Sequence, residues 1–207
     1  MLNPPHDLAL YRNYTGKERG VTMRVIAGIH KSKALESLEG RTTRPTMDKV
    51  KEGIFNSLQE ISGVGLDLFA GSGALGIEAL SRGMDRMIFI DQNFKAFKVI
   101  KHNLKSLELE DQAEVYKNNA ARALKILAKR EMQFDVIFLD PPYEKGLIDE
   151  ALEAIASFDL LKESGIIVCE FNHQEEIDTG DFQVIKRYHY GLTDTMLLEK
   201  GEQYDIN

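Results

Sequence analysis

Apolar and polar stretches follow one another regularly along most of the chain. Short apolar runs, typical of buried strands, lie at 65–69, 87–91, 113–116, 134–140 and 166–171. The stretches between them repeat apolar residues at helical spacing, which predicts helices at 75–82, 93–107, 119–130 and 147–156. Strands and helices in repeated alternation favour one parallel sheet covered by helices, so we expect an α/β fold.

Both ends of the chain depart from this alternation. Phe182–Tyr190 and Thr195–Lys200 are predicted to form a terminal hairpin that adds antiparallel edge strands. Near the N-terminus, Arg24–Ala27 and Ala34–Leu38 are candidates for short strands. Residues 1–22 show no hydrophobic periodicity, so we expect a flexible leader there.

A further helix is predicted after Pro45. Its apolar residues recur at helical spacing at Val50, Ile54, Leu58 and Ile61. The Thr46 hydroxyl can cap the helix start, and Gly63 is expected to lie near its end.

Length and composition fit one domain with an appendage, because 43% of the 207 residues are hydrophobic and 29% are charged. The sequence has no apolar stretch long enough for a membrane span and no secretory signal, so the cytoplasm is the expected location. The single cysteine, Cys169, lies in a predicted strand and is expected to be a buried thiol. We expect no metal site.

Charge is distributed unevenly. The net charge is −7, yet residues 1–53 contain 10 Lys/Arg and 6 Asp/Glu. Phosphate binding normally requires a basic surface, so this N-terminal part is where contacts with nucleic acid are expected. A merely solvated charged surface would have the same composition.

A glycine-rich turn follows the first strong strand. Gly71, Gly73 and Gly76 have the spacing G-x-G-x-x-G between an apolar strand and a helix, where glycine permits a tight turn and close approach of a ligand. Asp91 ends the next strand, where its carboxylate can accept hydrogen bonds from ribose hydroxyls. Together they predict a crevice that binds a nucleotide-like cofactor.

Two cofactor classes use such a turn. A dinucleotide oxidoreductase needs the same glycines, but Asp67 beside the turn would repel a pyrophosphate and can attract the ammonium group of a methionine moiety. S-adenosylmethionine is therefore favoured. The other predicted cofactor-binding residues are Phe69, Ser72, Gln92, Asn119 and Ala120. Asn119 is equally suited to cap a helix.

The most specific motif is Asp140-Pro141-Pro142-Tyr143, which follows a buried strand. An exocyclic base amine is a poor nucleophile, because its lone pair is delocalised into the ring. The Asp140 carboxylate and the Pro141 carbonyl can accept its two hydrogens, orient it, and stabilise the positive charge that develops on nitrogen. Pro142 stiffens the turn, and Tyr143 can stack on a base. The motif predicts methylation of a base amine.

These motifs resemble a known family, the RsmD family of bacterial methyltransferases that modify guanine N2 in 16S ribosomal RNA. Four blocks carry the resemblance, and they lie at 23–28, 44–52, 67–80 and 140–143. The resemblance implies a Rossmann-like class I methyltransferase with a seven-stranded, mostly parallel sheet, with S-adenosylmethionine as donor. The implied partner is 16S rRNA or the small ribosomal subunit during assembly. The implied RNA contacts are Arg24, Lys31, Lys33, Arg41, Arg44 and Thr46.

We therefore expect a flexible leader at 1–22, a basic N-terminal extension at 23–63 and a methyltransferase domain at 64–207. A DNA adenine or cytosine amino-methyltransferase is the nearest rival, although no inserted domain for DNA recognition is present. A non-catalytic RNA-binding module is disfavoured, because both turns are intact. The choice of guanine N2 over adenine N6 or cytosine N4 rests on the resemblance alone.

Overall fold

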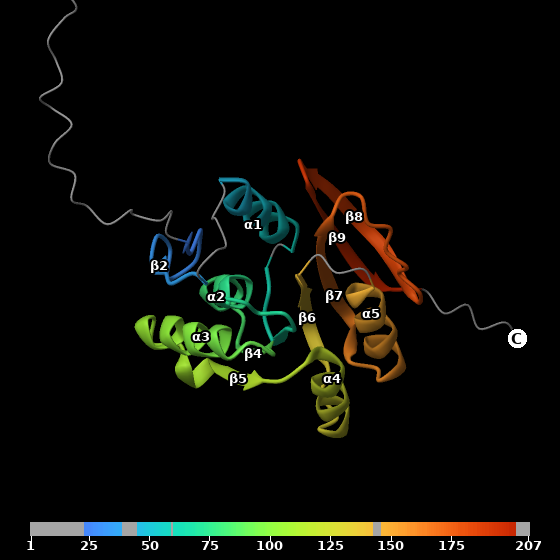
Figure 1. The fold of residues 1–207 in the computed structure, drawn as a ribbon, viewed down its shortest axis with the longest axis horizontal. Helices are drawn as coiled ribbons and strands as arrows, with labels where there is room; N and C mark the ends of the chain where they lie inside the picture. The colour runs from blue at the N-terminus through green and yellow to red at the C-terminus, as the bar shows by residue number, and fades with distance from the viewer. Residues whose placement is uncertain (1–22, 39–44, 59, 143–145, 202–207) are drawn as a thin grey trace, which may run out of the picture.

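The structure is a computed structural model that describes residues 23–38, 45–58, 60–142 and 146–201. The predicted leader, 1–22, lies outside the described residues. The described chain forms a seven-stranded sheet with helices on both faces and a separate two-stranded sheet (Figure 1). The α/β class and the mostly parallel sheet are confirmed.

The large sheet has the strand order β5-β4-β3-β6-β7-β9-β8. Its strands are β3 (Val64–Asp67), β4 (Arg86–Asp91), β5 (Ala113–Lys117), β6 (Phe134–Leu139), β7 (Leu161–Asn172), β8 (Phe182–Tyr190) and β9 (Thr193–Lys200). The five neighbouring strands β5, β4, β3, β6 and β7 pair in parallel. Strand β9 pairs antiparallel with both β7 and β8. The predicted terminal hairpin is thus present, with β8 as the edge strand.

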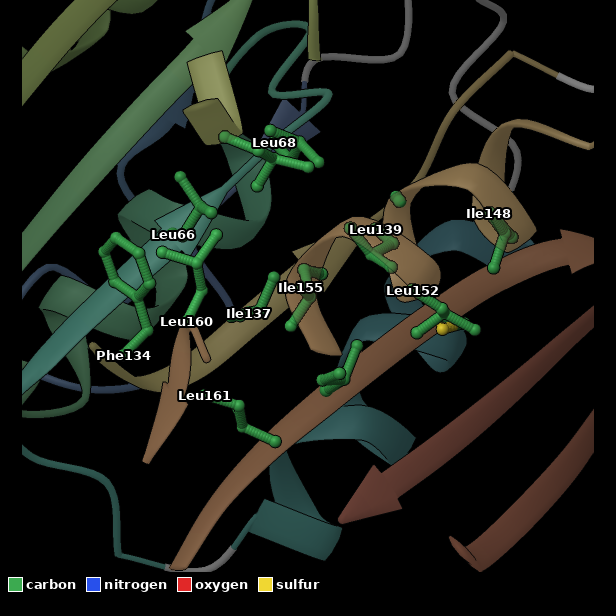
Figure 2. Close-up of a cluster of buried hydrophobic side chains, with 14 of the residues drawn as sticks. Leu66, Leu68, Phe134, Ile137, Leu139, Ile148, Leu152, Ile155, Leu160 and Leu161 are labelled. Atoms are coloured by element: carbon green, nitrogen blue, oxygen red, sulfur yellow. The ribbon is translucent and has the colours of Figure 1, made fainter. Parts of the chain in front are cut away.

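Helices cover the two faces of this sheet in separate groups. One face packs against α1 (Pro45–Leu58), α2 (Ala74–Ser81) and α3 (Phe94–Ser106), and the other packs against α4 (Ala120–Lys129) and α5 (Leu147–Ser157). Figure 2 shows part of the second core, where Leu152 and Ile155 of α5 belong to one cluster with Ile137 of β6. Each such side chain stabilises the fold by about 1.5–3 kcal/mol when fully buried. None of the described helices is long and apolar enough to cross a membrane.

The two N-terminal strands are shorter than predicted. Arg24–Ala27 was expected to be a strand, but β1 spans only Met23–Arg24 and pairs antiparallel with β2 (Ala34–Leu35). The backbone N–H groups of Ile26 and Ala27 donate to the Glu78 carboxylate, at 2.7 and 2.9 Å, instead of to a strand. The predicted strand Ala34–Leu38 also ends early, since the Glu36 N–H donates to Asn103 Oδ1.

Helix α1 differs from its prediction at both ends. It begins at Pro45, so Thr46 lies inside the first turn and is not the cap; proline suits a first helical position because no N–H is needed there. The helix ends at Leu58 and not near Gly63. Ile61 is buried although it lies beyond the helix, so the apolar pattern in the sequence extends past the end of the helix. Strand β7 begins at Leu161, before the predicted Ile166, with a shift in its register against β6.

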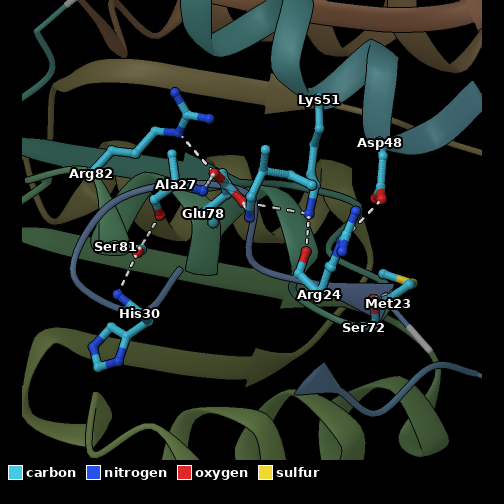
Figure 3. A network of polar contacts seen from close by, with 12 residues as sticks. Met23, Arg24, Ala27, His30, Asp48, Lys51, Ser72, Glu78, Ser81 and Arg82 are labelled. Atoms are coloured by element: carbon cyan, nitrogen blue, oxygen red, sulfur yellow. Dashed lines mark hydrogen bonds and ion pairs between the residues drawn. The ribbon is translucent and has the colours of Figure 1, made fainter. Parts of the chain in front are cut away.

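A buried carboxylate joins the N-terminal segment to helices α1 and α2 (Figure 3). Glu78 of α2 is fully buried and accepts hydrogen bonds from Ile26 N–H, Ala27 N–H and, at 2.8 Å, Arg82 Nε. Lys51 Nζ of α1 lies 3.4 Å from Glu78 and donates to the Arg24 carbonyl at 2.7 Å. Burial lowers the pKa of Lys51, and Glu78 opposes that effect. The Glu78 side chain therefore connects the segment after β1 with α1 and α2.

We predict that Glu78→Gln lowers the free energy of unfolding by about 3 kcal/mol, because Lys51 and Arg82 lose their common counter-charge inside the protein. The same substitution at Glu153, which is exposed on α5, should cost less than about 0.5 kcal/mol. Urea denaturation followed by circular dichroism measures both. Equal losses in the two variants would contradict a special role for Glu78.

Candidate active site

The sheet has a topological switch point between β3 and β6. These strands are parallel neighbours, but the chain continues from β3 to β4 on one side and from β6 to β7 on the other. The connections therefore diverge at the carboxyl ends of the two strands, and ligands of open α/β sheets bind in such a crevice. The glycine-rich turn follows β3, and the Asp140 turn follows β6.

The glycine-rich turn has the backbone conformation that its sequence predicts. Gly71 and Gly73 have φ values of +56° and +81°, which side chains other than glycine rarely adopt. Gly73 immediately precedes α2, and its N–H donates to the Ala70 carbonyl at 2.6 Å. The turn thus brings bare backbone to the edge of the crevice.

Asp91 fixes this turn to the end of β4. One oxygen, Oδ2, accepts the Gly71 N–H at 2.8 Å, and the other, Oδ1, accepts the Asn93 N–H at 2.7 Å. The side chain also lines the cavity described next. Because each carboxylate oxygen can accept two hydrogen bonds, Asp91 can hold the turn and still bind ligand hydroxyls.

A cavity of about 560 Å³ opens where the two turns meet. Of the predicted site residues, those that line it are Phe69, Gly71, Asp91, Gln92, Asn119, Ala120, Asp140 and Pro142. The structure thus brings the predicted donor turn and the predicted acceptor turn to one cavity. Its volume lies in the range of small-molecule and cofactor sites, about 300–1,000 Å³.

The residues of the Asp140 turn differ in their burial. Asp140 is half-buried and lines the cavity, as does the exposed Pro142, whereas Pro141 is buried. Tyr143 lies outside the described residues. The turn therefore places Asp140 in the wall of the same cavity that Asp91 lines.

Four predicted cofactor residues do not line this cavity, and they are Asp67, Ser72, Gly73 and Gly76. A Cβ atom on Gly76 would lie 2.3 Å from Phe89, so this glycine permits close packing of α2 on β4. The Ser72 carbonyl accepts a hydrogen bond from Asn103 Nδ2 at 3.0 Å. Asp67 is buried, and its carboxylate accepts the Gly76 N–H at 3.1 Å.

Asn119 caps α4, as one of its two interpretations predicts. Its side-chain oxygen accepts the Arg122 N–H at 2.8 Å, and the residue also lines the cavity. Its contact with an adenine ring remains a prediction. Cys169 is buried in β7, where burial raises the pKa of its thiol, so the predicted structural thiol is confirmed.

The predicted RNA contacts are only partly described. Lys31 and Lys33 are exposed in the segment between β1 and β2. The exposed Arg24 forms an ion pair with Asp48 at 3.4 Å. Arg41 and Arg44, together with the side chain of Thr46, lie outside the described residues.

Several residues of the cavity wall are not among the predicted site residues. They are Leu38, Leu68, Asn93, Asn118, Ala121, Leu124, Leu147, Glu150 and Ala151. Asn93 directly follows the predicted site residue Gln92, and Asn118 directly follows the end of β5. These positions in the sequence could have identified both residues. Leu38 comes from the N-terminal segment and Glu150 from the first turn of α5, and no motif marks either residue.

Comparison with known proteins agrees with this arrangement. The model of the family described as "Conserved hypothetical protein 95" matches residues 23–199. The chain belongs to this family. The predicted membership of the RsmD family is thereby confirmed, because relatives with the name "Ribosomal RNA small subunit methyltransferase D" match the same chain.

Individual relatives of this RsmD family member cover most of its length. YlbH of Bacillus subtilis (strain 168), whose name provisionally describes an rRNA methyltransferase, is 48% identical over 86% of this chain and 99% of the relative. Ribosomal RNA small subunit methyltransferase D of Haemophilus influenzae is 35% identical over 77% of this chain and 83% of the relative. The solved structure of the Escherichia coli protein yhhF, provisionally named a methyltransferase, has a TM-score of 0.75 and 27% identity, and the match covers 88% of this chain and 99% of that chain. The protein is a methyltransferase with the class I fold.

The buried Asp67 carboxyl makes the stability of the fold depend on pH. Burial raises the pKa of its carboxyl from 3.8 to about 7, although the hydrogen bond from Gly76 N–H opposes this rise. The folded state therefore holds a proton that the unfolded state releases, so Asp67 costs stability as the pH increases from about 4 to about 7. The difference corresponds to at most about 4 kcal/mol.

We expect Asp67→Asn to be as stable as the unchanged protein near pH 4.5 and more stable above pH 7. Its amide keeps an acceptor for Gly76 but carries no buried charge. Urea unfolding between these pH values measures the difference, and Asp111→Asn, at an exposed position, serves as the control. Parallel stability curves for the Asp67→Asn variant and the unchanged protein would refute the raised pKa.

Proposed function

We propose that this methyltransferase transfers a methyl group from S-adenosylmethionine to the exocyclic N2 amine of a guanine in 16S ribosomal RNA. The observation that carries the proposal is the common cavity, which is lined by Asp91, by Gly71 of the glycine-rich turn and by Asp140. A donor and an acceptor amine must meet in one water-poor space for direct methyl transfer. The small ribosomal subunit is the proposed partner.

The donor half of the cavity fits a nucleoside with a charged tail. Gly71 exposes backbone to the ligand, and Asp91 offers acceptors for ribose hydroxyls. Asp67 lies beneath the turn, and a cationic ammonium group nearby would favour its ionised form, which its burial disfavours. When bound, S-adenosylmethionine supplies an electrophilic methyl group on a sulfonium. A pyrophosphate would instead meet the Asp91 carboxylate in the cavity, with the Asp67 carboxyl buried behind the turn, and this disfavours a nicotinamide dinucleotide.

In the acceptor half, Asp140 and the Pro141 carbonyl accept the two hydrogens of the amine and aim its lone pair at the methyl carbon. With the donor bound, a C–N bond would form as the C–S bond breaks, so that positive charge would move from sulfur to nitrogen. The Asp140 carboxylate stabilises that charge, and the proton then leaves to Asp140 or to water. The prolines hold the acceptors in place.

Ribosomal RNA is the proposed substrate because of the relatives. Their names describe ribosomal RNA small subunit methyltransferases, and they match at 30–35% identity over about three quarters of the chain. The basic N-terminal residues Lys31 and Lys33 are exposed, as phosphate contacts require. Guanine N2 is proposed on the family resemblance, since the Asp-Pro-Pro-Tyr motif also suits adenine N6 or cytosine N4.

We predict that Asp140→Asn lowers kcat by about 10²–10³-fold and leaves the affinity for S-adenosylmethionine unchanged, because the loss affects the transition state of the acceptor. Single-turnover transfer of labelled methyl groups to small subunits measures the first effect, and isothermal titration measures the second. Asp111→Asn is the matched control and should retain full activity. An Asp140→Asn protein with normal turnover would exclude the proposed role.

Deletion of the gene tests the substrate. We expect one N2-methylguanine to disappear from 16S rRNA and to return when the unchanged gene, but not the Asp140→Asn gene, is restored. Primer extension and mass spectrometry of digested RNA detect the change. Unchanged 16S rRNA together with loss of an N6-methyladenine or N4-methylcytosine from DNA would favour the DNA amino-methyltransferase instead.

A further inference from the structure

Helix α3 carries a concentrated positive charge on one side. Its exposed lysines are Lys95, Lys98, Lys101 and Lys105, and the helix contains no acidic residue. At 100° per residue these four positions lie within an arc of about 120°. The opposite side of the helix packs into the core through Val99, Ile100 and Leu104. The lysines therefore form one continuous solvent-facing stripe.

This stripe is not an ordinary solvated helix surface. Solvated surfaces usually pair lysines with acids three or four residues away, which stabilises the helix. Within the described residues, none of the four lysines forms an ion pair, and the spacing from Lys101 to Lys105 places like charges together at some cost. In a chain with a net charge of −7, such a cluster of unpaired positive charges favours the binding of an external anion.

Aromatic rings lie within the stripe. Phe94 is 52% exposed, and its ring stacks on that of Phe97 with centroids 6.2 Å apart. Lys98 Nζ lies 4.5 Å from the Phe94 centroid, and Lys117 Nζ of β5 lies 5.6 Å from it. An exposed ring between ammonium groups can stack a base while the cations bind the adjoining phosphates.

The stripe begins at the rim of the cavity. Phe94 directly follows Asn93, and Lys117 directly precedes Asn118, and both asparagines line the cavity. At its other end, α3 binds the N-terminal segment through Asn103, whose side chain exchanges hydrogen bonds with Glu36. A strand of nucleic acid that enters the cavity can therefore continue along α3 toward the basic N-terminal residues.

We propose that this α3 lysine face, formed by Phe94, Lys95, Lys98, Lys101, Lys105 and Lys117, binds the phosphate backbone of the substrate RNA and stacks one of its bases on Phe94. The inference rests on the proposed function in taking RNA as the substrate. It adds a docking surface on the body of the fold, outside the N-terminal basic region. Charge complementarity selects a polyanion, and the exposed ring favours unpaired RNA over a duplex.

The paired variant Lys98→Gln/Lys105→Gln tests the face. The matched control is Lys125→Gln/Lys129→Gln on α4, which packs on the opposite face of the sheet and also has an exposed lysine in its last turn. Filter binding of transcribed 16S rRNA at several salt concentrations should show about tenfold weaker binding for the α3 pair. Its slope of log affinity against log salt should fall by about 1.5, since each lost contact removes about 0.7–0.9. The control pair should change neither quantity.

Kinetics and a second variant complete the test. The α3 pair should raise KM for RNA about tenfold and leave kcat and the affinity for S-adenosylmethionine unchanged, and Phe94→Ala should weaken RNA binding without changing the salt slope. Equal effects of the two lysine pairs, or no effect of either, would overturn the proposal. So would weaker binding to the small subunit with normal binding to naked RNA, which would indicate a protein partner. If the unchanged protein methylates no ribosomal RNA, the proposed function fails, while the binding data still decide whether α3 holds RNA.

Discussion

The hydrogen bonds of the Asp91 carboxylate hold the candidate site together. By accepting the N–H groups of Gly71 and Asn93, this side chain ties the turn after β3 to the end of β4. A turn with glycines at positive φ is intrinsically loose, because glycine loses more conformational freedom on folding than any other residue. A fixed carboxylate offsets that freedom. The Asp91 carboxylate thus fixes part of the wall of the cavity that Asp140 also lines.

A second carboxylate has the same effect for the N-terminal segment. Glu78 satisfies two backbone N–H groups that would otherwise need a strand partner, and it forms ion pairs with Lys51 and Arg82. Buried charges are tolerated only when they are paired and hydrogen-bonded, and Glu78 meets both conditions. As a result, the segment that carries Lys31, Lys33 and the cavity residue Leu38 is attached to α2, which itself begins at the glycine-rich turn.

The distribution of charge reconciles an acidic protein with the polyanionic substrate that we propose. Residues 94–130, which include α3 and α4, contain nine Lys/Arg and four Asp/Glu, whereas α5 contains three acids and no basic residue. The net charge therefore does not argue against the proposed RNA binding. Local charge near the cavity matters more, because screening by salt limits interactions between exposed charges to a range of about 8–10 Å.

Much of the protein follows from its sequence. Apolar periodicity predicted the strands and helices of the large sheet, because burial against one layer imposes a period of two or 3.6 residues. Local motifs predicted that Gly71, Asp91, Asn119 and Asp140 belong to the site, because each of these residues lies at or just after the end of a predicted strand. The tertiary structure alone decided the rest. Ile26 and Ala27 are not in a strand because their N–H groups donate to a carboxylate 52 and 51 positions away. Gly76 permits close packing of its helix against Phe89. Leu38 and Glu150 reach the cavity from distant elements. Contacts between residues far apart in the chain leave no periodic trace in the sequence, so only the folded arrangement determines them.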